Sequence, residues 1–393
     1  MKKVYLDHMA ATPLHPQALE AMLPFLKENF GNPQSLHSFG QPVQEAVEEA
    51  RAKVARLINA SAEEIFFTAS GSEANNFAVK GMALARRDKG KHLVVSAIEH
   101  QSVLNSVKSL ERLGFQATLV PVDRDGLVDP EAVAKALTPE TVFVSVMLAN
   151  SEVGSLEPVA DIARACRARQ VPFHTDAVAA VGNIPVDVRS LEVDALSLAG
   201  DQFYGPKGSA ALFVRKGVRI LPFVDGGIQE GGRRAGTENV AGIVGLGRAA
   251  EVAASELGRR MDKARALRDR LIEELPRRIE RVILTGQRTR RLPHHASFCI
   301  EFVEGEAMLL NLDMKGIAVS SGSACTSRAL KASHVLLAMG LDHALAQGSL
   351  VFGFLDSTRA EGLDYLLEVF PPIIRRLREM SPLYTKFLEE SRK

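Results

Sequence analysis

Short apolar runs alternate with helical segments between residues 65 and 202, and no other feature of the sequence restricts the fold as strongly. Helix-like stretches such as 130–137 and 159–169 separate the runs. The strand-like runs are 65–68, 92–97, 117–122, 142–147, 171–173 and 195–198. Because parallel strands need long crossover connections, usually helices, this order predicts a mainly parallel sheet with helices on both faces. The sequence therefore predicts the α/β fold class.

Polar residues follow several of these strands. In open α/β sheets ligands bind beyond the carboxyl ends of the strands, so residues at these ends are expected to form one site. The residues are Ser72, His100, Asn150, Asp176 and Gln202. Ser72 belongs to a turn of small residues that opens a helix, and free N–H groups there can bind an anion. The same turn could serve only as a helix cap, and the sequence alone favours that simpler role.

A second pattern follows a long helical region at 240–278. It contains a strand-like run at 296–302, shorter helical segments and a final helix at 363–380. This mixture predicts a second, smaller α+β domain. We place the boundary on the long helix near Arg260, which gives a large domain of residues 15–260. Residues 1–14 and 261–393 then form the small domain.

The small domain carries Cys325 within the run Ser-Ser-Gly-Ser-Ala-Cys-Thr-Ser at 320–327. None of these side chains is large enough to cover sulfur, so the segment is predicted to be an exposed loop. An exposed thiol can act as a nucleophile or sulfur carrier, and Arg328 beside it favours the thiolate. The alternative is a small residue with no chemical role. Cys166 lies in a helical run and Cys299 in an apolar strand, so both are expected to be buried and inert.

Composition limits the classes of partner and the location. The three cysteines are widely spaced, which argues against a disulfide framework and a CxxC metal site and fits a reducing cytoplasm. A net charge of +1 gives no sign of a nucleic-acid partner. No apolar run has the length of a signal peptide or a membrane span. We therefore expect a cytoplasmic protein without membrane or nucleic-acid contacts.

Several motifs occur in order along nearly the whole chain. They are Tyr-Leu-Asp-His at 5–8, Ala-Ala-Thr-Pro at 10–13, Gly-Asn-Pro at 31–33, Glu-His at 99–100, Tyr-Gly-Pro-Lys-Gly at 204–208, Arg-Ala-Gly-Thr-Glu-Asn at 234–239 and Ser-Gly-Ser-Ala-Cys-Thr-Ser at 321–327. With these motifs the chain resembles cysteine desulfurases of the NifS/IscS type, in the class V aminotransferase group of fold-type I pyridoxal-phosphate proteins. The resemblance implies a large domain with a mainly parallel sheet and a small α+β domain. It also implies a homodimer with active sites at the dimer interface.

The resemblance assigns cofactor-binding roles to individual residues. Gly71 and Ser72 match the turn that holds the cofactor phosphate, and Thr237 matches a phosphate ligand contributed by the other subunit. His100 matches the catalytic imidazole that stacks on the pyridine ring. Asp176 matches the carboxylate that pairs with the pyridinium nitrogen, which keeps the ring an electron sink.

Two further matches concern the substrate and its sulfur. Asn150 matches a residue near the cofactor phenol oxygen and the substrate. Cys325 matches the nucleophile that takes sulfur from cysteine as a persulfide. The same thiol could instead lend an iron–sulfur ligand to a cluster shared with a scaffold protein.

The chain departs from the family pattern at five positions. The position of the Schiff-base lysine is Gln202, whose carboxamide cannot condense with an aldehyde and has no basic nitrogen. The histidine and serine positions that help hold the phosphate are Asp201 and Ala199, and a carboxylate repels a phosphate. A glutamine position is Ala179, and the substrate-binding arginine position is Val351. An alkyl group cannot make the bidentate bond that holds an amino-acid carboxylate.

Three interpretations follow. The one we favour is a desulfurase-family protein of sulfur transfer and iron–sulfur cluster assembly that is impaired in pyridoxal-phosphate catalysis and acts through Cys325 on a sulfur acceptor or scaffold. Any pyridoxal phosphate would then bind weakly and without a covalent bond, or not at all. The second is an active cysteine desulfurase that converts L-cysteine to L-alanine and an enzyme persulfide. The third is a structural paralogue that binds a partner and takes part in no reaction. Lys207 is not expected to replace the missing lysine, because its turn fixes its reach.

Overall fold

The computed structural model describes residues 3–321 and 332–391. A seven-stranded sheet forms the centre of the larger part, with the strand order β2-β8-β7-β6-β5-β3-β4. Its strands are β2 (Ile65–Thr68), β3 (His92–Ser96), β4 (Gln116–Val120), β5 (Thr141–Ser145), β6 (Phe173–Asp176), β7 (Ala195–Ala199) and β8 (Ala210–Val214). Neighbouring strands pair in parallel except at β8, which runs antiparallel to β2 and β7. The predicted α/β class with a mainly parallel sheet is confirmed.

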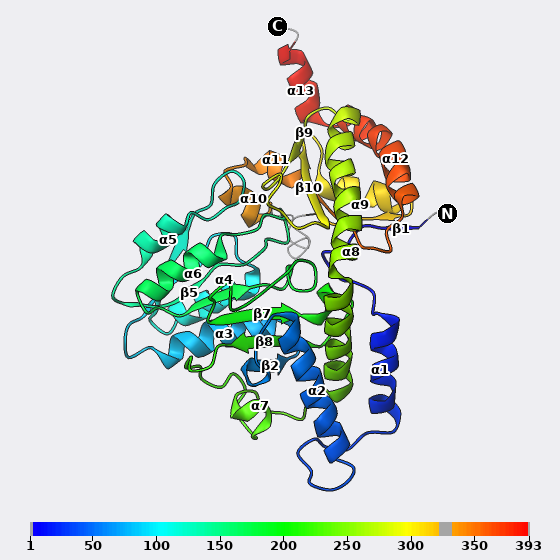
Figure 1. The fold of residues 1–393 in the computed structure, drawn as a ribbon. Coiled ribbons are helices and arrows are strands. Elements are labelled where there is room, and N and C mark those ends of the chain that lie inside the picture. The colour runs from blue at the N-terminus through cyan, green and yellow to red at the C-terminus, as the bar shows by residue number, and fades with distance from the viewer. Residues whose placement is uncertain (1–2, 322–331, 392–393) are drawn as a thin grey trace.

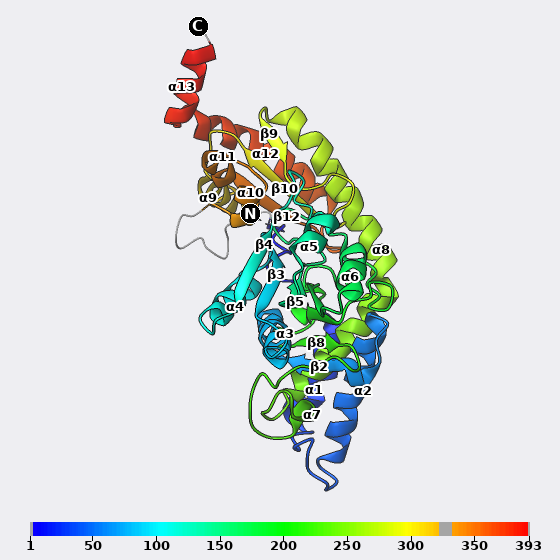
Figure 2. The ribbon, with the colours of Figure 1, turned by 90° about the vertical axis from the view of Figure 1, so that its left-hand side faces the viewer.

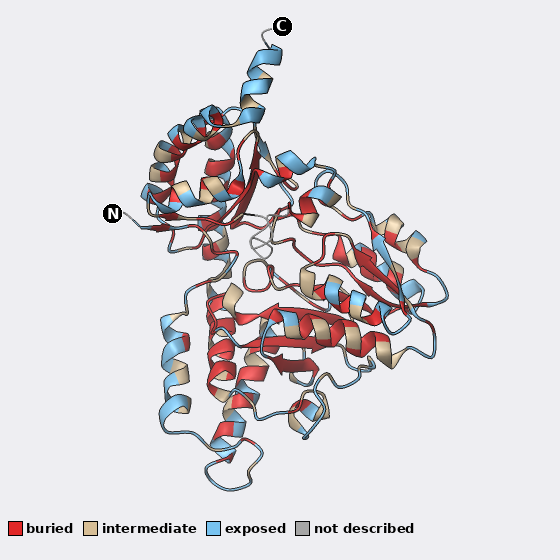
Figure 3. Cartoon of the chain, turned by 180° about the vertical axis from the view of Figure 1, so that it is seen from behind, coloured by how far each residue is buried: buried red, intermediate tan, exposed pale blue. Residues whose placement is uncertain are grey.

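Helices cover both faces of the sheet (Figures 1 and 2). The helices are α1 (Pro16–Lys27), α2 (Gln41–Leu57), α3 (Gly71–Ala85), α4 (Gln101–Glu111), α5 (Pro130–Ala136), α6 (Val159–Ala168), α7 (Gln229–Gly232), α8 (Val240–Arg278), α9 (Gly305–Asp313), α10 (His334–Ala338), α11 (His343–Gln347), α12 (Ala360–Glu379) and α13 (Pro382–Ser391), with 3₁₀ turns η1 (Ala62–Glu64) and η2 (Gly200–Gln202). Successive side chains of a strand point to opposite faces. Ile65 and Phe67 of β2 accordingly join the core under α2, α5 and α6, whereas Phe66 joins the core under α3 and α4. Apart from the edge strand β4, the strands of this sheet are almost wholly buried between these layers (Figure 3).

The smaller part is built on a three-stranded antiparallel sheet with the order β12-β10-β9. The strands are β9 (Val282–Leu284), β10 (His295–Ile300) and β12 (Ser349–Gly353), and a parallel pair joins β1 (Val4–Tyr5) to β11 (Ile317–Ala318). Their apolar side chains form a separate core with α9 and α12. The β1–β11 pair brings the N-terminal strand to this part of the molecule, although the other strands of this part lie between residues 282 and 353.

Helix α8 spans both parts (Figure 1). Its first half contributes Ala249 and Ala253 to the core of the large sheet, and its second half contributes Leu267 and Leu271 to the small core. The proposed boundary at Arg260 lies between these two groups. In the described part of the chain, no helix combines the length and the apolar character that crossing a membrane needs.

Candidate functional site

A chain of hydrogen bonds links the carboxyl end of β6 to the start of α4. Asp176, the last residue of β6, accepts a hydrogen bond from Asn75 Nδ2 at 2.6 Å. The same nitrogen donates to the Ser102 hydroxyl at 2.9 Å, and this hydroxyl lies 2.7 Å from His100 Nδ1. The structure therefore brings Asp176 and His100 into one connected site. Asn75 was not among the predicted residues, and its position on the second turn of α3 gave no sign of a contact with β6.

The first turn of α3 packs closely on the loop that follows β6. A Cβ atom at Gly71 would lie 2.6 Å from Val178 Cγ2, so a larger residue does not fit at this position. Ser70 caps the helix, because its hydroxyl accepts from the N–H of Glu73 at 3.1 Å. Ser72 is exposed beside it. The turn thus caps the helix through Ser70 and still presents the Ser72 hydroxyl and N–H groups to an anion.

Thr237 lies exposed on the loop between α7 and α8. Arg234 of the same loop forms an ion pair with Glu73 at the first turn of α3, with 2.8 Å between Nε and Oε1. This pair holds the loop near the predicted phosphate site of its own subunit. The contact of Thr237 with the other subunit stays a prediction.

Gln202 ends the turn η2 after β7, and the N-terminal segment fixes the main chain there. The N–H and hydroxyl of Thr12 donate to the Asp201 carbonyl at 2.9 and 2.8 Å. The N–H of Tyr204 donates in turn to the Thr12 hydroxyl at 2.8 Å. Asn183 Nδ2 donates to the carbonyl of Gln202 at 3.2 Å. The turn that carries a lysine in the family is therefore firmly held, but here it presents a carboxamide.

The other departures replace polar side chains by small, apolar or acidic ones. Ala179, Ala199 and Val351 are all buried. Asp201 is half-buried, and burial raises the pKa of its carboxyl group while the charge of Lys207 lowers it. None of these groups offers the hydrogen-bond donor or cation that a phosphate or an amino-acid carboxylate needs.

Asn150 organises the loop after β5 instead of leaving its amide free. Its Oδ1 accepts from the N–H groups of Glu152 and Val153 at 2.8 and 3.0 Å. Its Nδ2 donates to the carbonyl of Ile98 at 3.0 Å. Asn150 therefore joins the two loops that carry His100 and Glu152, and this positions both beside one cavity.

That cavity, of about 340 Å³, lies between the two parts of the chain. Its described lining residues contain no lysine or arginine. They are Met9, Ala10, Ile98, Glu99, His100, Gln101, Met147, Asn150, Ser151, Glu152, Ser320, Ser321, Ala332, Ser333, His334 and Val351. Ser320, Ser321 and Ala332 flank the segment that holds Cys325, which lies outside the described residues. The cavity thus borders both ends of the predicted cysteine loop.

Acidic groups with raised pKa values lie on or beside this cavity. Glu99 is fully buried, accepts from the Ser96 hydroxyl and the Met147 N–H at 2.7 Å each, and leaves Oε2 without a hydrogen bond to a described residue. Burial raises the pKa of Glu99 to about 8. Burial also raises the pKa of Glu152 to about 7, against the effect of a hydrogen bond from Ser333. Since no lysine or arginine is among the described lining residues, this part of the lining does not favour an anionic substrate.

The two cysteines within the described residues are both buried. Burial raises the pKa of Cys166 and of Cys299 to about 12, so neither thiol forms a thiolate readily. The prediction that these two side chains are buried is confirmed.

The large mixed sheet with a polar site at its strand ends, joined by one long helix to a small α+β part, is the architecture of fold-type I pyridoxal-phosphate proteins. Residues 4–366 match the class-V aminotransferase family. The chain belongs to this family, and within it to the cysteine desulfurases. It is 49% identical over 381 residues to cysteine desulfurase IscS of Dictyoglomus turgidum, and the alignment covers 97% of each chain. It is 47% identical over 390 residues to cysteine desulfurase IscS of Clostridium botulinum, which covers 99% of this chain and 98% of the relative.

Solved structures give the same result. A NifS-like protein superposes with a TM-score of 0.90 at 35% identity, over 95% of this chain and 100% of the other. A NifS-like protein from Rickettsia africae superposes with a TM-score of 0.86 at 29% identity, again over 95% and 100%. The family is dependent on pyridoxal phosphate, and the predicted resemblance is confirmed.

Proposed function

We propose that this chain works in sulfur transfer and iron–sulfur cluster assembly while being impaired in pyridoxal-phosphate catalysis. The observation that carries the proposal is the turn after β7, where Gln202 stands at the lysine position on a well-held main chain. A carboxamide is not nucleophilic and cannot form an imine. The side chain of Lys207 lines a different pocket with Tyr5 and Thr12, so it does not supply the missing amine at the cavity beside His100.

The residues present do not fit a covalently held pyridoxal phosphate. Asp176, Ser72 and His100 keep the types that the family uses for the ring and the phosphate. Asp201 opposes a bound phosphate, and Ala199 offers it no hydroxyl. Val351 gives a substrate carboxylate no cation at the cavity. We therefore assign no reaction step to this cofactor, and any binding of it would be weak.

The chemistry of the proposed function lies with Cys325. The two other cysteines are buried, so they are poorly suited to exchange sulfur. The flanks of the Cys325 segment border a cavity of about 340 Å³, where we place the partner side chain or small sulfur species. We propose that Cys325 accepts persulfide sulfur from a donor, or lends a ligand to a cluster held on a scaffold protein, within a homodimer in the cytoplasm.

Borohydride reduction tests the loss of covalent cofactor binding. The purified chain is incubated with pyridoxal phosphate, reduced and measured by intact mass and peptide mapping. We expect no stoichiometric pyridoxyl adduct on the wild-type chain. The variant Gln202→Lys is the matched control, and it should gain an adduct at residue 202 because the turn that carries it is already in place.

A stoichiometric adduct on Lys207 of the wild-type chain would contradict the proposal and would restore the interpretation as an active desulfurase. An adduct that appears on Gln202→Lys alone would support it. Visible spectra of the same samples give an independent measure of any bound cofactor.

A further inference from the structure

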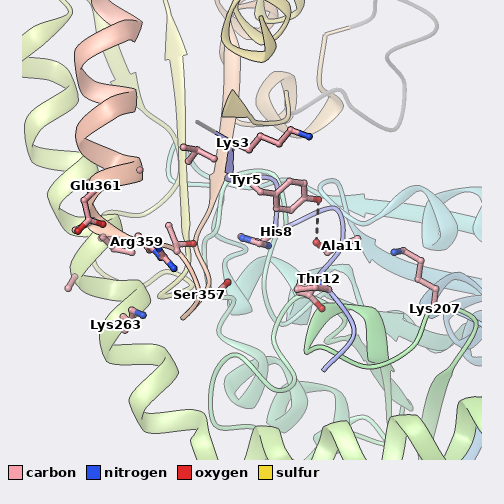
Figure 4. A pocket seen from close by; sticks show the side chains of 17 residues that line it. Lys3, Tyr5, His8, Ala11, Thr12, Lys207, Lys263, Ser357, Arg359 and Glu361 are labelled. Carbon is pink, nitrogen blue, oxygen red and sulfur yellow. Dashed lines mark hydrogen bonds between the residues drawn. The ribbon is translucent and has the colours of Figure 1, made fainter. Parts of the chain in front are cut away.

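A second and larger pocket lies on the other side of the N-terminal segment, where β1, α8, the start of α12 and the turn after η2 meet. Its volume is about 1350 Å³, and it shares no lining residue with the cavity beside His100. Figure 4 shows Lys263 and Arg359 on one side, Lys207 on the opposite side, and Tyr5 and His8 between them. None of the described residues assigned above to the cofactor, the substrate or the transferred sulfur lines this pocket.

Cations dominate the charge of the pocket. Lys3, Lys207, Lys263 and Arg359 line it, and Glu361 is the single carboxylate among its described lining residues. Within residues 3–321 and 332–391, none of the four cations has a carboxylate within ion-pair distance. Lys263 donates only to the main-chain carbonyl of Asp356. These charges come from four separate segments, so they surround the pocket instead of forming one exposed row.

Neutral donors complete the same pocket. Helix α12 begins there, and its cap residue Arg359 makes no side-chain cap hydrogen bond. The first N–H groups of a helix attract anions, and the hydroxyls of Ser357 and Thr358 lie beside them. His8 lines the pocket, is only 6% exposed, and its Nδ1 makes no hydrogen bond with a described residue. Burial lowers the pKa of His8 and a hydrogen bond to the main chain of Tyr5 raises it, so Nδ1 is the ring nitrogen left to meet a polar group of a ligand.

We propose that this pocket binds a small molecule that carries two or more phosphate groups. A single phosphate can be held by one or two cations, whereas four cations around a pocket of this volume suit a chain of phosphates. The start of α12, with Arg359 and Lys263, binds one end of the chain. Lys207 and Lys3 meet its other groups. Tyr5, which is 45% exposed, offers an aromatic face at the rim for a base or another flat group.

Isothermal titration calorimetry on the full-length chain tests this proposal with tripolyphosphate and with ATP. We expect both to bind, and to bind more weakly at 0.5 M than at 0.1 M salt, because ionic contacts are screened. The double variant Lys263→Ala/Arg359→Ala should weaken both by at least about tenfold. The matched control is Arg375→Ala, which removes an exposed arginine from the same helix α12. Circular dichroism confirms that each variant is folded.

Tighter binding of ATP than of tripolyphosphate would support the proposal and identify a nucleotide, while equal binding would support it and identify the phosphate chain alone. Three results would overturn it: no binding of either probe at millimolar concentration, equal loss in Arg375→Ala, or equally tight binding of an octaglutamate peptide. The last would indicate an acidic protein segment instead. Because the readout is binding, failure of the proposed sulfur-transfer function would leave this test unchanged.

Discussion

Single functional groups decide what the old cofactor site can do. Gln202 ends in a carboxamide and is one atom shorter than a lysine, and the main chain around it is held by four hydrogen bonds to Thr12 and Asn183. The proposed impairment of catalysis is therefore chemical, because the main chain of the turn is held in place. The same holds for Val351, which is buried at the cavity without distorting β12. A site whose frame persists while its reactive groups change is well suited to a new use of the retained surface.

Glu99 gives a pH dependence that can be measured. Its pKa is raised from 4.5 to about 8 by burial. Below pH 4.5 the carboxyl is protonated in both the folded and unfolded states, so Glu99 does not lower the free energy of unfolding there. Between pH 4.5 and 8 the unfolded chain loses this proton while the folded chain keeps it, and the free energy of unfolding falls by about 1.4 kcal/mol for each pH unit. Above pH 8 the carboxyl is ionised in both states, and Glu99 lowers the free energy of unfolding no further.

The variant Glu99→Gln removes this titration while keeping the shape of the side chain. Urea unfolding at pH 5, 6.5 and 8 should therefore give a stability difference, variant minus wild type, that grows with pH. Glu28→Gln, which changes an exposed side chain, serves as the control. Parallel pH curves for Glu99→Gln and wild type would show that Glu99 is ionised in the folded protein.

Thiol reactivity separates the three cysteines. Cys166 and Cys299 have pKa values near 12 because they are buried, so their thiolate fractions at pH 8 are negligible. We expect Cys325 to react with a thiol reagent at least about a hundredfold faster than the other two. Time-resolved labelling with peptide mass analysis measures each rate, and Cys325→Ala should abolish the fast phase. One slow rate shared by all three would contradict the proposed role of Cys325.

Among the elements, the junction of α3 with the loop after β6 depends on a missing side chain. In Gly71→Ala the new Cβ would lie 2.6 Å from Val178 Cγ2. We expect a loss of about 1–3 kcal/mol in the free energy of unfolding, measured by urea denaturation. Gly258→Ala is the matched control, because nothing lies within 4 Å of a Cβ there and it is exposed in α8. That control should gain up to about 1 kcal/mol.

The second substitution Val178→Ala should recover part of the loss in Gly71→Ala, because it removes the atom that the new Cβ would meet. If Gly71→Ala were as stable as wild type or more stable, like Gly258→Ala, the close contact with Val178 would carry no cost and only the higher helix propensity of alanine would remain.

Elements with strong local patterns were predictable, and those set by distant contacts were not. The helix predicted at 240–278 matches α8, because the cap residue Asn239 marks its start and helically spaced apolar residues mark its length. Strand β8 was absent from the prediction, since its place between β2 and β7 depends on pairing that the sequence order does not show. Asn75 was missed for the same reason: its bond to Asp176 joins residues 101 positions apart. The predicted roles at the cofactor site remain predictions, because they depend on groups that the chain alone does not contain.

At the scale of the whole molecule, one region exposes several large apolar side chains to solvent. Helix α1 exposes Leu19, Leu23 and Leu26, which are 45%, 37% and 61% accessible. The loop that follows exposes three more large side chains, Phe30 at 79%, Leu36 at 91% and Phe39 at 64%. The rings of Phe30 and Phe39 contact each other, with 6.0 Å between centroids, and exposed apolar side chains gathered in this way mark a protein interface. It supports the proposed homodimer, because a two-fold axis can pair the patch with its own copy.

The dimer is tested by charging this patch. In Leu26→Asp/Phe30→Asp two carboxylates on each subunit would be buried against an apolar partner surface, which is costly without compensating cations. We expect sedimentation velocity at micromolar concentration to give a dimer for the wild type and a monomer for the variant. Leu383→Asp on α13, at a leucine that is 55% exposed, should leave the dimer intact. A wild-type monomer would refute the homodimer outright. Loss of the dimer in Leu383→Asp but not in the patch variant would instead place the interface at α13, on the side of the small core.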